Sequence, residues 1–224
     1  MVVGMTWPPR DIGRTNANGP PALEVIPPAS SAGERPPKSR LIHGDLHARN
    51  IMIGELEPLE HRIVPILKLI DFGMSRDVPV RNNEIPGLIE KTNILAIGKV
   101  MLGLIGGHER GGPGMMDVTD KGQQKSINTY ATDLDGLSNK YNAPRNIKAL
   151  HQDKLANLDP EIRSLVALCV AVKAEDRPDI EYLLSEIERN VQEKTPQYYH
   201  GYKYQANESD EEMKRIVERY MLNA

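Results

Sequence analysis

The chain reads Leu41-Ile42-His43-Gly44-Asp45-Leu46-His47-Ala48-Arg49-Asn50-Ile51-Met52-Ile53 and, further on, Ile66-Leu67-Lys68-Leu69-Ile70-Asp71-Phe72-Gly73. In both stretches, polar side chains lie directly beside an apolar run of the kind found in buried β-strands. The first stretch offers one carboxylate, Asp45, and one amide, Asn50, in a loop between two such runs. The second ends its strand on the carboxylate of Asp71. We therefore expect short strands that carry three oxygen-bearing side chains at their ends.

The order of these groups resembles two motifs of eukaryotic-type protein kinases, the catalytic loop His-x-Asp-x-x-x-x-Asn and the metal-binding triplet Asp-Phe-Gly. The resemblance implies that Asp45 accepts or orients the proton of the acceptor hydroxyl. It also implies that Asp71 and Asn50 hold the Mg2+ ions that neutralise the phosphates of ATP, since Mg2+ prefers oxygen ligands. Arg49 stands where tyrosine kinases commonly carry an arginine near the catalytic base, which makes it a second catalytic candidate.

The two histidines of the first stretch have less direct roles. By the resemblance, His43 braces the loop through packing and hydrogen bonds, whereas His47 is expected to be a surface residue of the loop and not a ligand. A purely structural interpretation exists for the polar groups, because Asp and Asn often cap turns. We favour the chemical interpretation, since three caps at this spacing, each beside an apolar strand, would be an unusual coincidence.

An apolar run from Leu88 to Ile105 predicts a helix that is buried on more than one face. It resembles the central helix of the large kinase lobe, with Asn93 and Leu95 in place of the Asp and Trp of Asp-x-Trp-x-x-Gly. Cys169 and Arg177-Pro178 look like the two final helices of that lobe and the arginine between them. The resemblance spans about residues 41–192. It is closest to divergent fungal kinase-like proteins with a His-Gly-Asp-Leu-His catalytic loop.

Between the strands and after the central helix, the patterns are weaker. The segment from Glu55 to Pro65 reads as a hairpin connection, so that the next strand starts near Ile66. Residues 115–157 are polar and predict a loop with one or two short helices, one of them near 144–155.

Three helices are expected in the last third of the chain. Asp159 and Pro160 begin the first, which runs to about residue 172. The second begins at 178 or 179 and runs to about 193. An amphipathic helix over 208–222 follows, with Ser209 and Glu212 as a candidate capping box.

The predicted fold is mainly α: a protein-kinase-like C-terminal lobe with small β-hairpins at the catalytic and metal-binding loops, and without the small N-terminal lobe. Residues 1–40 contain 12 Pro or Gly, a composition typical of disordered segments. The expected domains are therefore a disordered Pro-rich segment over 1–40, the lobe over 41–192, and a linker with the C-terminal helix over 193–224.

The resemblance is incomplete in four places. One is the helix that should precede the catalytic loop, since residues 20–40 are too Pro-rich to form it. No Gly-rich loop after a strand, and no strand lysine for the nucleotide phosphates, precedes His43 in this sequence. Gly44 stands where many kinases carry the arginine that pairs with a phosphorylated activation loop, so no such switch is expected. No Ala-Pro-Glu string follows Asp71, which leaves Arg177 without its usual Glu partner. We expect a truncated lobe that binds ATP–Mg2+ weakly and transfers phosphate poorly.

Composition limits the partners and the compartment. The net charge of −3 gives no electrostatic reason to expect nucleic acid or an anionic membrane as a partner. The mean hydropathy of −0.47 and the absence of a long apolar run or a signal-like N-terminus predict a cytoplasmic or nuclear protein that is not secreted. The single cysteine, Cys169, lies in an apolar run and is expected to be a buried structural thiol.

Three functions remain open from the sequence. The first is a protein kinase that transfers the γ-phosphoryl group of ATP to a Ser, Thr or Tyr hydroxyl of a protein. The second is a small-molecule kinase of the aminoglycoside or choline type, which also carries His-Gly-Asp-x-x-x-x-Asn and lacks Ala-Pro-Glu. The third is a non-catalytic pseudokinase or binding module that uses the Pro-rich segment and the C-terminal helix for partners.

Overall fold

The computed structural model describes residues 40–56, 61–79, 87–106, 112–134, 158–201 and 205–223. About half of these residues are helical and the sheets are small and antiparallel, which confirms the mainly α class. The strands are β1 (Leu41–Ile42), β2 (Ile51–Ile53), β3 (Leu67–Leu69), β4 (Arg76–Asp77), β5 (Gly114–Asp120) and β6 (Gln123–Thr129). The helices are α1 (Leu88–Gly106), α3 (Pro160–Cys169), α4 (Ile180–Glu193) and α5 (Asp210–Val217), the last continuing as a π-helical turn over Glu218–Leu222. Short 3-10 turns occupy Ala48–Asn50, Phe72–Met74, Thr132–Leu134, Ala174–Asp176 and Gln205–Glu208.

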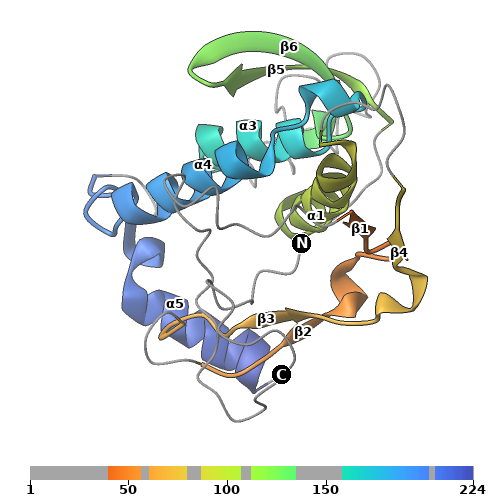
Figure 1. Cartoon of the computed structure of the whole chain (residues 1–224). Coiled ribbons are helices and arrows are strands. Elements are labelled where there is room, and N and C mark those ends of the chain that lie inside the picture. The colour runs from red at the N-terminus through yellow and green to blue at the C-terminus, as the bar shows by residue number, and fades with distance from the viewer. Residues whose placement is uncertain are drawn as a thin grey trace, which may run out of the picture.

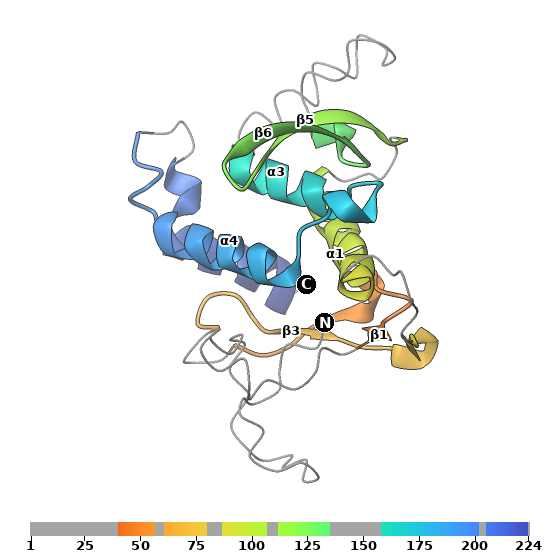
Figure 2. The same ribbon diagram turned by 45° about the horizontal axis from the view of Figure 1, so that its top comes forward.

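The described structure has a helical layer between two hairpins. Figure 1 shows the β5–β6 hairpin lying over α3, with α1 and α4 on the other side of α3 and the β2–β3 hairpin at the opposite end of the molecule. The turned view in Figure 2 keeps this order. The arrangement leaves the loops around β1–β4 and β2–β3 at the end of α1 that carries its N-terminus.

Two small strand pairs form near residue 45, and the sequence predicts the one between β2 and β3. β2 pairs with β3 in antiparallel register, with Ile51 opposite Leu69, and β1 pairs with β4, with Leu41 opposite Asp77. β3 starts at Leu67, close to the predicted start, because Pro65 has no N–H to donate to a strand partner. The hairpin connection is therefore confirmed for its described ends, whereas residues 57–60 lie outside the described residues.

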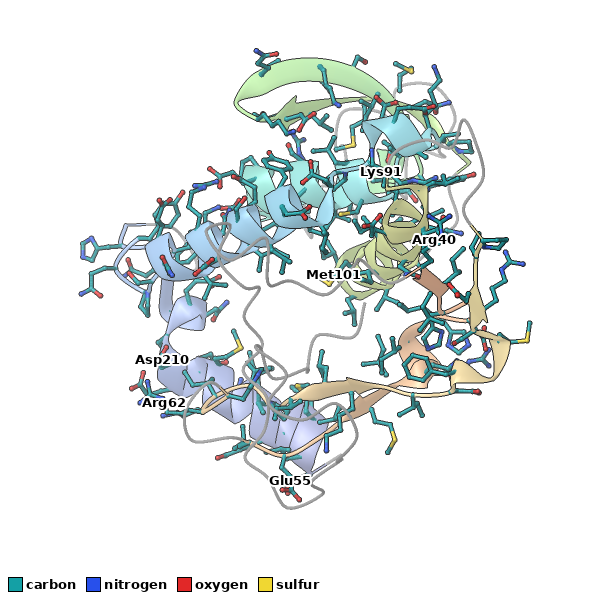
Figure 3. All side chains as sticks on the ribbon, in the orientation of Figure 1. Arg40, Glu55, Arg62, Lys91, Met101 and Asp210 are labelled. Atoms are coloured by element: carbon teal, nitrogen blue, oxygen red, sulfur yellow. The ribbon has the colours of Figure 1, made fainter. Side chains whose placement is uncertain are left out.

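α1 coincides with the predicted helix, but its burial is less complete than predicted. Ile94 and Leu102 are buried, whereas Met101 and Leu104 are 40% and 72% exposed; Figure 3 labels Met101 on this helix. Burial on more than one face is therefore wrong for the C-terminal half of α1. α1 packs tightly on α3 at Gly98, where a Cβ atom would lie 2.7 Å from the Cβ of Cys169.

The main hydrophobic core lies between the β5–β6 hairpin, α3 and the C-terminal half of α1. Its larger buried members are Leu102, Met116, Val118, Ile127, Leu134, Val166, Leu168 and Val170. Cys169 belongs to a neighbouring buried cluster with Ile94 and Leu183. It is buried as predicted, and this burial raises the pKa of the thiol to about 12. A thiol with such a pKa is a packing group and not a nucleophile at neutral pH.

The prediction of loop and short helices after residue 115 is wrong for residues 115–129. β5 and β6 form a hairpin whose turn, Lys121-Gly122, has positive φ angles of 50° and 76°. Two such angles in succession are typical of the two-residue turns that match strand twist. Alternate residues of both strands are buried against α3, among them Val118 and Ile127. The helix predicted near 144–155 lies outside the described residues.

α3 starts as predicted and ends early. The carboxylate of Asp159 accepts hydrogen bonds from the backbone nitrogens of Glu161 and Ile162, and Pro160 occupies the first turn. The helix stops at Cys169 instead of residue 172, because the next residues pair with the end of β6 and the residue after it: Tyr130 N donates to Val170 O, and Val172 N donates to Asn128 O. These bonds replace the helical ones and join α3 to the hairpin.

α4 and α5 also lie close to their predicted positions. Asp179 caps α4 by accepting a hydrogen bond from Tyr182 N at 2.7 Å. Ser209 caps α5 by accepting one from Glu212 N at 3.2 Å, which supplies one half of the candidate capping box. The carboxylate of Glu212 instead binds Arg215.

The proposed segment 1–40 lies outside the described residues except for Arg40, and the boundary at 193 stays a prediction. Among the described helices, none combines the length and the apolar character needed to cross a bilayer.

Candidate functional site

The catalytic-loop stretch folds back so that its carboxylate and its amide meet. The side-chain Nδ2 of Asn50 donates to the backbone oxygen of Asp45 at 2.8 Å and to its Oδ2 at 3.1 Å. Asn50 N donates to His47 O at 2.9 Å, which closes the 3-10 turn between them. Gly44, with φ of +82°, makes the sharp bend before Asp45. The predicted pair Asp45 and Asn50 is therefore brought together by one tight loop.

Asp71 joins this pair through the strands. Ile70 N donates to Asn50 O at 2.9 Å, so that the residue before Asp71 is bonded to the backbone of Asn50. Asp71 itself adopts a left-handed conformation with φ of 58°, and its Oδ1 accepts a hydrogen bond from Gly73 N at 3.3 Å. Its side chain is exposed. All three oxygen-bearing side chains thus come from one cluster of loops, between β1, β2 and β3.

His43 contacts both the loop that carries Asp45 and the loop that carries Phe72. It is 2% exposed, its Nε2 lies 3.1 Å from Ile70 O, and its ring lies 4.7 Å from that of Phe72, centroid to centroid. Its Nδ1 accepts a hydrogen bond from Asp45 N at 3.3 Å. A neutral imidazole with its proton on Nε2 satisfies both contacts. These contacts correspond to the bracing role expected for His43.

Asn93 of α1 anchors the same loop and is a residue that the sequence did not indicate as part of the site. Its Oδ1 accepts a hydrogen bond from His43 N at 3.2 Å, and its Nδ2 donates to Leu41 O at 2.9 Å. The available signal was a short polar side chain inside an apolar helix, because a buried amide needs hydrogen-bond partners. Ser75 was missed as well: its hydroxyl donates to His43 O at 3.2 Å.

The remaining candidates differ in how closely they approach Asp45. Arg49 is exposed, and its guanidinium forms no ion pair with any residue that the structure describes. His47 was expected to be a surface residue of the loop and not a ligand. Its Nε2 lies 3.4 Å from Asp45 Oδ1, and its ring is 37% exposed. His47 is thus a partly exposed residue of the loop, and the turn that ends at Asn50 carries its ring toward Asp45.

Asp71 and Asn50 offer one carboxylate and one amide oxygen, the kinds of donor that Mg2+ accepts. Within the described ranges, no group of three or more His, Cys, Asp or Glu side chains could hold a metal ion. Mg2+ in nucleotide sites is usually bound by one or two carboxylates, with phosphate and water supplying the other ligands. The exposed carboxylate of Asp71 and the amide oxygen of Asn50 are suited to this kind of binding, since the Nδ2 of Asn50 is already used on Asp45.

Arg177 links the helices behind the site. Its Nε donates to Ala171 O at 2.9 Å, one terminal nitrogen donates to Val172 O at 3.1 Å, and the other to Lys91 O at 3.2 Å. Lys91, labelled in Figure 3, lies on α1 two residues before Asn93. Burial lowers the pKa of Arg177. Backbone carbonyls therefore bind the guanidinium for which the sequence offers no Glu partner.

Comparison of the chain with protein-family models, with curated proteins and with solved structures finds no match in any of the three.

Proposed function

We propose that this chain is a protein-kinase-type phosphotransferase lobe, which transfers the γ-phosphoryl group of ATP to a protein hydroxyl with low activity as a single lobe. The observation that carries the proposal is the double contact of Asn50 with Asp45, made next to the strand that leads into Asp71. A capping role explains one carboxylate at a time. It does not explain why an amide and two carboxylates gather at one loop cluster.

Each side chain has a distinct task in this proposal. Asp45 is 43% exposed and tied to the loop, so it can orient the acceptor hydroxyl and accept its proton. Asp71 and the amide oxygen of Asn50 would hold magnesium, which would neutralise charge on the transferred phosphate. Arg49 is exposed beside Asn50 and offers a cation for the phosphate or the acceptor.

The protein-kinase type is favoured over the small-molecule type by the second half of the chain. Arg177 bridges the segment after α3 to α1, and α1 in turn anchors the catalytic loop through Asn93. The resemblance to the protein-kinase lobe rests on this same Arg177-Pro178 ending. The two experiments below distinguish the proposal from a small-molecule kinase and from a non-catalytic binding module.

Nucleotide binding is the first test. A fluorescent ATP analogue is titrated into the full chain with and without Mg2+. We expect weak binding that requires Mg2+ and that falls at least about 10-fold in Asp71→Asn, since the variant loses the anionic ligand. Asp117→Asn is the matched control, because Asp117 is an exposed carboxylate on β5, outside the site. Binding that is equal with and without Mg2+ would favour the binding module.

Acceptor choice is the second test. Peptides, intact proteins and small hydroxyl compounds are offered with ATP–Mg2+, and transfer of labelled phosphate is measured. We expect slow transfer to protein hydroxyls, reduced about 10²- to 10⁴-fold in Asp45→Asn. Transfer confined to small hydroxyl compounds would assign the chain to the second type, and transfer that survives Asp45→Asn would rule out the role given to Asp45.

A further inference from the structure

The carboxylate of Asp45 has a partner on each oxygen, and both partners come from the same turn. Oδ2 accepts from Asn50 Nδ2 at 3.1 Å, and Oδ1 lies 3.4 Å from His47 Nε2. The main chain of Asp45 is tied as well, since its nitrogen donates to His43 and its oxygen accepts from Asn50. The side chain therefore has little freedom to rotate in the described structure.

We propose that His47 is a positioning residue, which orients the carboxylate of Asp45 by donating from Nε2 to Oδ1. The proposal rests on the function proposed above, since it specifies how the group that faces the acceptor hydroxyl is held. His47 and Asn50 then act as the two ends of one clamp. Their own separation is fixed, because Asn50 N donates to His47 O at 2.9 Å.

The carboxylate beside Nε2 favours one neutral tautomer of His47. Nδ1 is buried and has no hydrogen-bond partner among the residues that the structure describes. A proton on Nδ1 would bury an unpaired N–H and would also turn the lone pair of Nε2 toward the carboxylate of Asp45. Among the described residues, Nδ1 lacks a partner in either neutral tautomer, but a proton on Nε2 avoids the repulsion between a lone pair and the carboxylate and makes Nε2 the donor to Oδ1.

The clamp leaves the catalytic face of Asp45 open. The side chains of Asp45 and His47 are 43% and 37% exposed, so a hydroxyl can reach the carboxylate while the two donors hold it. A distance of 3.4 Å is long for a hydrogen bond to a carboxylate, and such contacts often shorten when substrate binds. A misplacement of about 1 Å can lower the rate about 100-fold, so a carboxylate that is held in place should catalyse faster than one that rotates freely.

The contact is tested without relying on catalysis. Long-range 1H–15N spectra of the imidazole nitrogens are recorded for the full chain, with His47→Gln to assign the signals. We expect the pattern of an Nε2–H tautomer at His47, shifted by Asp45→Asn and unchanged by the control Asp117→Asn. The side-chain 13C shift of Asp45 is read in His47→Ala, in case Asp45→Asn does not fold. Averaged His47 signals like those of exposed His200, with no response to Asp45→Asn, would overturn the proposal.

The consequence for catalysis is tested by measuring kcat and KM for ATP separately. We expect His47→Ala to lower kcat about 10- to 100-fold, as is usual for residues that orient a functional group, with KM for ATP nearly unchanged. His47→Gln should restore most of kcat, since its amide can donate from a similar position. An unchanged kcat in His47→Ala would overturn the proposal. If the unsubstituted chain transfers no phosphate to any acceptor, the proposed function fails, and the spectra alone decide whether His47 holds Asp45.

Discussion

The backbone nitrogen of His43 is bound by the side chain of a residue fifty positions later, Asn93, across 3.2 Å. The same amide donates to Leu41 O at 2.9 Å. One side chain of α1 therefore binds two backbone groups of the segment that leads into the catalytic loop. A carboxylate could accept the first bond but could not donate the second. The amide is therefore matched to both backbone groups that it meets.

Asn93→Ala should destabilise the chain, because it removes the partners of two backbone groups in a site that is 9% exposed at Asn93. Each group that is left unsatisfied costs about 1–3 kcal/mol. The free energy of unfolding in urea measures the loss. Asn128→Ala is the control, since the side chain of Asn128 is exposed on β6. Equal stability of the two variants would contradict the anchoring role of Asn93.

Gly44→Ala should be more costly than Gly122→Ala, although both glycines have positive φ angles, +82° and +76°. Both variants incur the left-handed conformational penalty, about 1–2 kcal/mol. A Cβ at Gly44 would in addition lie 2.4 Å from Met74 O, whereas at Gly122 it would meet nothing within 4 Å. Urea unfolding of the two variants gives the difference directly, and a larger loss in Gly122→Ala would contradict the structure. The same contact explains why no arginine fits this position.

Gly98 and Gly103 form a second matched pair, both within α1. Gly98→Ala would place a Cβ 2.7 Å from that of Cys169 and 2.8 Å from Val170 Cγ1, which overpacks the helix contact and should cost about 1–3 kcal/mol. Gly103→Ala meets nothing within 4 Å and should gain up to about 1 kcal/mol from helix propensity. Thermal unfolding of both variants should show midpoint shifts of opposite sign. Shifts of the same sign would rule out close packing at Gly98.

The sequence predicts best where local chemistry decides the structure. Asp159, Asp179 and Ser209 each cap the helix assigned to them, because a capping side chain needs only the next two or three backbone nitrogens. The meeting of Asp45 and Asn50 is equally local, since a five-residue loop closes it.

The features that the sequence did not reveal depend on contacts between distant segments. The β5–β6 hairpin has strands with several polar residues, and only α3 beneath it shows why Val118 and Ile127 are buried. α3 ends early because Val172 N binds Asn128 O of that hairpin. The contact of Asn93 with His43 joins residues fifty apart, and no pattern within α1 identifies its partner.

The free energy of unfolding should depend on pH through an ion pair that joins the N-terminus of α3 to the C-terminus of α4. Lys194 Nζ lies 2.7 Å from Asp159 Oδ1 and 3.3 Å from Glu161 Oε2, and its side chain is 6% exposed. Burial alone would raise the pKa of Asp159, but the ion pair with Lys194 and the backbone N–H groups of α3 hold it below its usual value of 3.8. Burial alone would lower the pKa of Lys194, but Asp159 and Glu161 hold it above 10.5.

The lowered pKa of Asp159 contributes stability that is present above pH 3.8 and is lost as the pH falls through the lower value of the folded state. The raised pKa of Lys194 contributes stability below pH 10.5 that is lost as the pH rises through the higher folded value. Lys194→Met should therefore reduce stability at pH 7 by about 1–3 kcal/mol, less than a buried pair usually costs, because Asp159 keeps two backbone donors. Its loss of stability below pH 3.8 should be smaller than that of the unsubstituted chain. Urea unfolding from pH 2 to 7, with the exposed Lys214→Met as control, measures both effects, and parallel acid profiles would show that Lys194 does not hold Asp159 ionised.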